Sequence, residues 1–199
     1  EAVALPFGGM TALDFLRRGD VKAGERVLVN GASGNVGSAT VQLAKHRGAH
    51  VTAVCSAANA ELACSLGADE AIDYTSTDFA AGDARYDVIV DCVGNAPYAR
   101  VRSVLTRGGR LLAVIADLPA MLSAPFIGGV HKHRVIAGPA VEKVEDLATL
   151  AELAEKGAFK PVIDQRLPFA RIVDAYRVVD SGRKKGSMIV TLDPRASLR

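Results

Sequence analysis

The chain has 199 residues, 49% of them hydrophobic and 23% charged, and a formal net charge of +2. These values fit one globular domain, or one domain with an appendage, and they give no reason to expect nucleic acid or an acidic membrane as a partner. No apolar run is long enough to cross a bilayer. The three cysteines form no CxxC pair, which suits a reducing compartment, so we expect a cytoplasmic protein.

Short apolar runs alternate with helical patterns along most of the chain. Such alternation predicts a parallel, doubly wound sheet, so the expected fold is an α/β, Rossmann-type sheet of about six strands. The expected strands cover Arg26–Asn30, His50–Cys55, 71–74, 87–91, 110–115 and Arg134–Ala137. The expected helices between and before them cover 10–18, 38–46, 60–66 and 97–105.

The C-terminal part departs from this alternation. Residues 144–156 predict an amphipathic helix, and residues 187–192 predict a closing strand. A second helix is predicted over 170–180, with a buried apolar face made of Ile172, Val173, Tyr176 and Val179. We therefore divide the chain into a Rossmann domain at 1–143 and a C-terminal segment at 144–199.

Glycines 31, 34 and 37 stand between the first strand and the helix that follows it. This context predicts a dinucleotide site, because Gly31 permits the tight turn and Gly34 lets a pyrophosphate approach the backbone. Gly37 lets the helix pack close to the strand, and free N–H groups at the helix start then face the anion. The alternative is an ordinary βα turn without a ligand.

The end of the second strand bears on the choice of cofactor. An acidic residue there would bond the ribose hydroxyls of NADH, but the chain has Ser56 and no carboxylate before Glu61. We therefore expect NADPH in preference to NADH. No Arg or Lys stands at this turn, and Ser56 could instead cap the next helix.

Further motifs occur in a fixed order around the glycine loop. They are LPFGGMTAL at 5–13, VKAGERVLV at 21–29, SLGADEAIDY at 65–74, YDVIVDCVG at 86–94 and GGRL at 108–111. With these motifs the sequence resembles the medium-chain dehydrogenase/reductase superfamily, specifically its zinc-independent, quinone-oxidoreductase-like branch. The resemblance implies hydride transfer from NADPH to a small-molecule acceptor such as a quinone, an enone or a similar carbonyl compound.

The resemblance also implies which residues hold the cofactor. Gly34, Asn35, Val36 and Gly37 would cradle the pyrophosphate, and Ser56 and Tyr74 would lie beside the 2′-phosphate. The nicotinamide side would be contacted by Thr11, Cys92, Val93, Gly94, Val114 and Ile115. Each has a plainer alternative: Thr11 could bond its own helical turn, Tyr74 could be an exposed loop aromatic, and Val114 and Ile115 could be core.

Departures from the family pattern limit these expectations. Relatives often carry a basic residue where Ala58 stands and Lys where Ser187 stands, so tight 2′-phosphate binding is weakened. Relatives also have an N-terminal GroES-like catalytic domain, and nothing in this sequence corresponds to it. We expect the segment from 144 onward to pack on such a domain, and the catalytic residues stay unknown.

Other interpretations remain open. The chain could be a catalytically silent NAD(P)-binding module, or a short-chain-type NADP-dependent reductase, although no Tyr-x-x-x-Lys pair is present. His131 and His133 alternate at strand spacing without a third ligand, so no metal is expected. The strand Arg134–Ala137 would form a sheet edge, and a homodimer through this edge is a further hypothesis.

Overall fold

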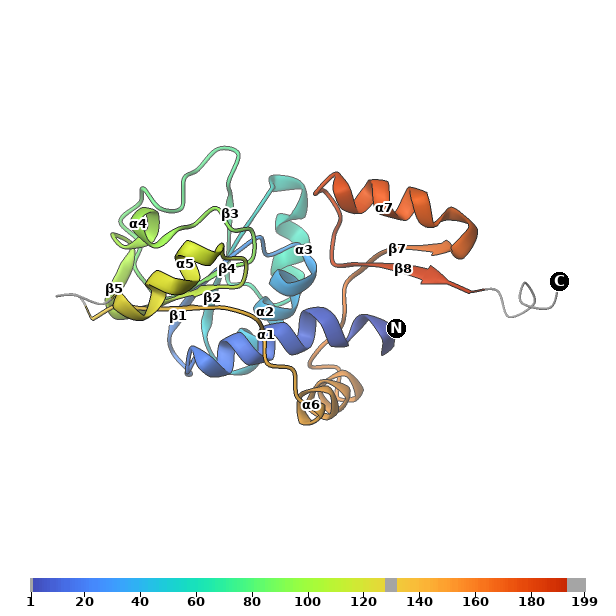
Figure 1. The fold of residues 1–199 in the computed structure, drawn as a ribbon, viewed down its shortest axis with the longest axis horizontal. Helices are drawn as coiled ribbons and strands as arrows, with labels where there is room; N and C mark the ends of the chain where they lie inside the picture. The colour runs from blue at the N-terminus through green and yellow to red at the C-terminus, as the bar shows by residue number, and fades with distance from the viewer. Residues whose placement is uncertain (1, 128–131, 193–199) are drawn as a thin grey trace.

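The computed structural model describes residues 2–127 and 132–192. A six-stranded parallel sheet with the order β3-β2-β1-β4-β5-β6 forms its centre, which confirms the Rossmann-type α/β fold (Figure 1). The strands are β1 (Arg26–Asn30), β2 (His50–Cys55), β3 (Glu70–Asp73), β4 (Tyr86–Asp91), β5 (Leu105–Ala113) and β6 (Arg134–Ala137).

Helices cover both faces of this sheet. One face carries α1 (Pro6–Arg18), α2 (Asn35–His46), α3 (Ala60–Ser65) and α6 (Val144–Glu155). The other face carries the short α4 (Tyr98–Val101), and α5 (Leu118–Ser123) leads toward the β6 edge. Short 3-10 turns add Ala2–Ala4, Ala57–Asn59, Ala124–Phe126 and Phe169–Arg171. None of the described helices is long and apolar enough to cross a bilayer.

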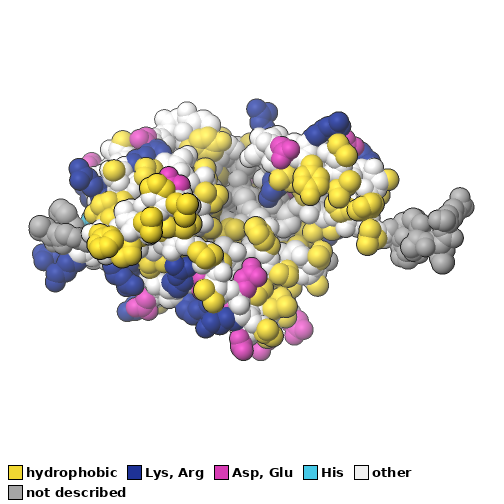
Figure 2. All heavy atoms as spheres, viewed as in Figure 1, with side chains coloured by type: hydrophobic (Ala, Val, Ile, Leu, Met, Phe, Trp, Pro, Cys, Tyr) yellow, Lys and Arg dark blue, Asp and Glu magenta, His cyan; other side chains and the backbone are white. Residues whose placement is uncertain are grey.

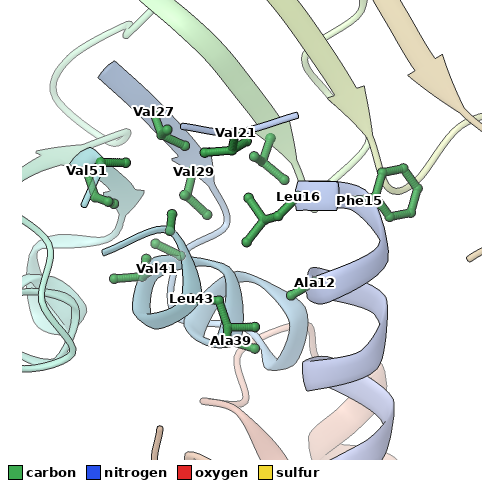
Figure 3. Packing of buried hydrophobic residues seen from close by; sticks show 14 of the residues in the cluster. Ala12, Phe15, Leu16, Val21, Val27, Val29, Ala39, Val41, Leu43 and Val51 are labelled. Carbon is green, nitrogen blue, oxygen red and sulfur yellow. The ribbon is translucent and has the colours of Figure 1, made fainter. Parts of the chain in front are cut away.

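Alternation along β1 shows why the strands sit at the centre. Val27 and Val29 belong to the apolar cluster under α1 and α2, whereas Leu28 belongs to the cluster on the opposite face. Successive side chains of a strand point to opposite faces, so a continuous apolar run fits a strand covered on both sides. Figure 3 shows side chains of α1 and α2 packed toward Val27 and Val29.

A βαβ unit follows α6, and we call residues 163–191 the C-terminal strap. Strands β7 (Ile163–Pro168) and β8 (Ser187–Thr191) pair in parallel, with α7 (Ile172–Asp180) between them. Figure 1 shows the strap projecting from one end of the sheet domain. The segment that leads into the strap is joined to that domain through α2: the Gln42 side chain donates to the Lys160 carbonyl (3.0 Å) and accepts from the Lys160 N–H (2.8 Å).

Helix α6 has its own attachment to the sheet domain. Leu150 is fully buried in the cluster beneath α1 and α2. Arg17 of α1 bridges two carboxylates, Asp14 at 2.9 Å and Asp146 of α6 at 2.7 Å. The division of the chain at 143/144 stays a prediction.

Several predicted elements are wrong in extent. The helix predicted over 97–105 is only α4, because Leu105 already begins β5, and β5 continues through the glycine pair expected to precede it. Gly108 has a φ of +81°, and the pairing of β5 with β4 shifts register between Tyr86 and Val88. The same strand ends at Ala113, so Val114 and Ile115 lie beyond it. Strand β7 and helix α5 were not predicted.

The predicted burial of α7 is also wrong. Val173 and Tyr176 are 58% and 63% exposed, and Val179 is 39% exposed. Within α7 only Ala175 is buried. The amphipathic pattern formed the helix as predicted, but no described part of the chain covers its apolar face.

Candidate functional site

Apart from Thr11 of α1, the predicted site residues follow the carboxyl ends of the parallel strands. Because β1 to β5 run parallel, the turns after their carboxyl ends meet at one edge of the sheet. The turn after β1 holds the glycine loop, and the next turns hold Ser56, Tyr74, the segment Cys92–Gly94 and the pair Val114–Ile115. In open α/β sheets, ligands bind outside the carboxyl ends of the strands.

The glycine loop has the geometry of an anion cradle. Gly31 adopts a left-handed φ of +81°, and a Cβ at Gly37 would overlap the Gly31 carbonyl oxygen. Helix α2 begins at Asn35, three residues earlier than predicted, and the first bond into its first turn is Ser38 N–H to Gly34 O at 2.9 Å. The earlier N–H groups of this turn have no intrahelical acceptors, and Gly34 has no side chain to cap them.

Two other elements press against this loop. A Cβ at Gly8 of α1 would overlap the Asn35 side chain, so α1 lies directly against the start of α2. On the other side, the N–H of Gly186 in the strap donates to Ser33 O at 2.9 Å. Sequence reasoning missed both Gly8 and Gly186, because a close approach between distant segments leaves no local pattern.

The adenosine end of the predicted site lies at the ends of β2 and β3. Ser56 is half-buried and makes no side-chain cap bond to the following turn, and Tyr74 is 61% exposed. Asn59 Nδ2 donates to Ser33 Oγ at 3.1 Å, which ties this turn to the glycine loop. Asp73 ends β3 beside Cys55, its partner in the sheet, and sequence reasoning gave this carboxylate no role.

A buried carboxylate shapes the turn after β4. Asp91 is 2% exposed, and its Oδ1 accepts from Val93 N–H and Gly94 N–H, both at 3.0 Å. The same Oδ1 accepts from Asn30 Nδ2 at 2.9 Å, and Oδ2 accepts from Ala96 N–H at 2.9 Å. Four donors on one carboxylate fix this turn against β1.

That fixed turn brings three predicted residues together. A Cβ at Gly31 would lie 2.6 Å from Val93 Cγ2, and a Cβ at Gly94 would lie 2.9 Å from Ile115 Cγ2. Val93 and Ile115 are 47% and 55% exposed, so both offer apolar surface beside the glycine loop. Val114 packs against the core, which is the plainer alternative for that residue.

Cys92 and Thr11 are less available than their neighbours. Burial raises the pKa of the Cys92 thiol to about 12, and the adjacent Asp91 carboxylate adds to the rise. The Thr11 hydroxyl donates to the Phe7 carbonyl at 2.8 Å, which is the bond within its own helical turn that the alternative foresaw. Neither side chain presents a reactive group at the site as it stands.

Two cavities flank α2. One of about 350 Å³ lies beside the glycine loop, with Phe7, Asn35, Lys184 and Met188 among its lining residues. A larger one of about 720 Å³ lies between α2, α3 and the chain around Pro161, and no glycine-loop residue lines it. The smaller cavity is therefore the one connected with the predicted site.

The described residues provide no metal site. Within 2–127 and 132–192, no group of three or more His, Cys, Asp or Glu side chains is placed to hold an ion. His131 lies outside the described residues. His133 is 3% exposed, with its Nδ1 3.0 Å from Tyr98 Oη and its Nε2 3.1 Å from Thr106 O, so hydrogen-bond partners occupy both ring nitrogens.

Comparison with known proteins finds the same fold and sequence pattern. A family model described as "Zinc-binding dehydrogenase" matches residues 66–190. A chloroplast envelope quinone oxidoreductase homolog of Arabidopsis thaliana is 35% identical over 202 residues, covering 96% of this chain and 61% of the relative. A chloroplastic NADPH-dependent alkenal/one oxidoreductase of the same plant is 32% identical over 194 residues, covering 96% and 46%.

A solved structure has the same fold as this chain. The quinone oxidoreductase from Coxiella burnetii superimposes with a TM-score of 0.85 at 25% identity, covering 96% of this chain and 60% of that one. The chain thus spans between 46% and 61% of the length of these three proteins.

Proposed function

The chain belongs to the medium-chain dehydrogenase/reductase superfamily, in its quinone-oxidoreductase-like branch, and on this basis we propose that it binds NADPH for hydride transfer to a quinone, an enone or a similar carbonyl acceptor. Its relatives are named as oxidoreductases, and one of them as NADPH-dependent, which supports this proposal. The preference for NADPH and the class of acceptor are the parts that this proposal adds.

One observation carries the proposal: in the glycine loop between β1 and α2, Gly31 has a left-handed φ, Gly34 offers no capping side chain, and Gly37 leaves no room for a Cβ. A pyrophosphate fits such a cradle, because backbone donors and the positive end of the α2 dipole both favour an anion. The residues present therefore fit a dinucleotide.

The rest of the site would orient the cofactor and exclude water. A bound nicotinamide would supply the hydride chemistry itself. Asp91 holds the turn that presents Val93 beside Gly31, and Ile115 lines the same side, so the chain offers an apolar wall to a flat ring.

NADPH is proposed over NADH because strand β2 ends in Ser56 and carries no carboxylate of its own. The relative from Arabidopsis named as NADPH-dependent agrees with this preference. The test is calorimetric titration of each reduced cofactor against the native chain and Ser56→Glu. We expect the native chain to prefer NADPH and the variant to lose that preference; an unchanged ratio would contradict the role of Ser56.

The proposed reaction needs no zinc, because a bound nicotinamide would supply the hydride. Turnover is tested by following the loss of NADPH absorbance with a quinone or an enone present. Oxidation of NADPH that depends on the acceptor would support the enzyme. Cofactor binding without turnover would favour the catalytically silent module. In that case residues 144–199 would have to pack on a GroES-like domain before the cleft could be completed.

We also propose that the chain forms a homodimer and resides in the cytoplasm. Strand β6 (Arg134–Ala137) ends the described sheet order, and an unpaired edge can pair with its copy. Light scattering at micromolar concentration should then give twice the chain mass of 20.8 kDa, and a monomer mass would remove the dimer.

A further inference from the structure

Strand β3 supplies a carboxylate at the place where β2 has none. Asp73 is the partner of Cys55 in the pairing of β2 with β3, so it stands level with the last residue of β2. The backbone N–H of Ala57, in the turn just after Ser56, also faces this carboxylate and contributes to its lowered pKa. Asp73 therefore borders the turn that would meet the adenosine ribose.

Hydrogen-bond donors, and no cation of the described residues, surround this carboxylate. Thr75 donates to it twice, from its N–H at 3.0 Å and from its hydroxyl at 2.8 Å, and these bonds hold the pKa of Asp73 below its usual value. No Lys or Arg of the described residues forms an ion pair with it. A carboxylate has about four acceptor positions, so it can still accept a bond from a ligand.

The neighbouring polar groups favour a hydroxyl over a phosphate. Asn59 Oδ1 is buried without a hydrogen-bond partner among the described residues, while its Nδ2 bonds Ser33 of the glycine loop. Acceptors pair with the ribose hydroxyls of NADH, whereas the 2′-phosphate of NADPH is itself an anionic acceptor. Asp73 and the Ser56 turn therefore act in opposite directions on cofactor choice.

We propose that Asp73 is a specificity-determining residue that limits the preference for NADPH and keeps NADH usable. This inference rests on the proposed function. Asp73 ends β3 level with the last residue of β2, the strand whose end carries an acidic residue in NAD-selective sheets.

The test is the ratio of the NADH and NADPH dissociation constants in the native chain and in Asp73→Asn. Asparagine keeps the acceptor for Thr75 N–H and removes only the charge. We expect the ratio to move toward NADPH by about fivefold to tenfold, the size of one charge acting on a phosphate near a protein surface. Glu70→Gln is the matched control, since it removes the same charge from the opposite end of β3 and should leave the ratio within twofold of native.

The outcomes separate the two proposals. If the native chain binds a cofactor and Asp73→Asn leaves the ratio unchanged, or Glu70→Gln shifts it equally, the role of Asp73 is overturned and the proposed function stands. If the native chain binds neither cofactor, the proposed function fails and this inference fails with it. If Asp73→Asn fails to fold, the inference is tested on the native chain by the salt dependence of the same ratio. Raising ionic strength from about 0.05 M to about 0.5 M should then move the native ratio toward NADPH, and no such movement would overturn the inference.

Discussion

Two βαβ units of the molecule, β1-α2-β2 and β7-α7-β8, differ in how much of them is buried. In β1-α2-β2, every residue of α2 from Gly37 to Ala44 is buried, and so are four of the five residues of β1. In β7-α7-β8 of the strap, α7 buries only Ala175, although its amphipathic pattern is the stronger of the two. A helical pattern thus predicts the helix but not what covers it.

The contrast is visible on the molecular surface. Figure 2 shows hydrophobic side chains over α7 and over α5, whereas the apolar side chains of α2 are enclosed. Two polar attachments join this region to the sheet domain, namely the bonds of Gln42 with Lys160, just before the strap, and the bond of Gly186 in the strap with Ser33. Buried apolar side chains therefore stabilise the sheet domain, whereas α7 of the strap contributes little buried surface.

The largest effect is expected from Gly37→Ala in the sheet domain. Its Cβ would overlap the Gly31 carbonyl oxygen, so α2 must move away from β1. We expect a loss of about 3 kcal/mol or more in the free energy of unfolding, measured by urea denaturation. Gly34→Ala is the matched control, because its Cβ would lie 3.4 Å from the same oxygen, and it should cost about 1 kcal/mol or less. Equal costs would show that the close approach is not what holds the loop.

A cavity in the sheet domain ranks next. Leu28 is fully buried on the face opposite α2, and Leu28→Ala should cost about 2–5 kcal/mol in urea denaturation. A cost below about 1 kcal/mol would mean that this face of the sheet is as loosely covered as the strap.

The joint between the regions is tested by Gln42→Ala. Its amide makes two bonds with the Lys160 backbone and is 8% exposed, so its loss should cost about 1–2 kcal/mol. We also expect faster cleavage around 157–163 in limited proteolysis, since that segment loses its anchor. Gln165→Ala on the exposed side of β7 is the control, and an equal cleavage rate in both variants would contradict the anchoring role.

The smallest effect belongs to α7. Val173 is 58% exposed, so Val173→Ala should change the free energy of unfolding by about 0.5 kcal/mol or less. A cost near that of Leu28→Ala would reveal that another surface covers α7 in solution, and the comparison between the two units would then fail.

The sequence predicts the bounds of a strand correctly where that strand is a continuous apolar run. Strands β1, β2 and β6 have the predicted bounds, because β-branched runs flanked by glycines and polar turns admit few other structures. Strand β7 was missed because its sequence IDQRLP has only two aliphatic residues, so neither period stands out. Leu105 was assigned to a helix because the apolar spacing of Val101, Val104 and Leu105 also fits one.

The candidate site was predictable where it is local. The glycine loop and the turns after the strands follow from chain order and parallel pairing. A role for Asp73 was not predicted, because an acidic residue was expected in the chain just after β2. The Asp73 carboxylate is instead brought to the end of β2 by the pairing of Cys55 with Asp73. The contacts of Gly8 and Gly186 with the glycine loop were not predicted for the same reason, since contacts between distant segments form only on folding.

The central claim is that the glycine loop binds a nicotinamide dinucleotide through its backbone. The most direct measurement is calorimetric titration of NADPH into the native chain and into Gly34→Ala, with thermal melting of both. The account predicts binding of one equivalent by the native chain and an affinity at least about tenfold weaker in a variant that melts at nearly the native temperature. No binding to the native chain, or equal affinity in both, would contradict it.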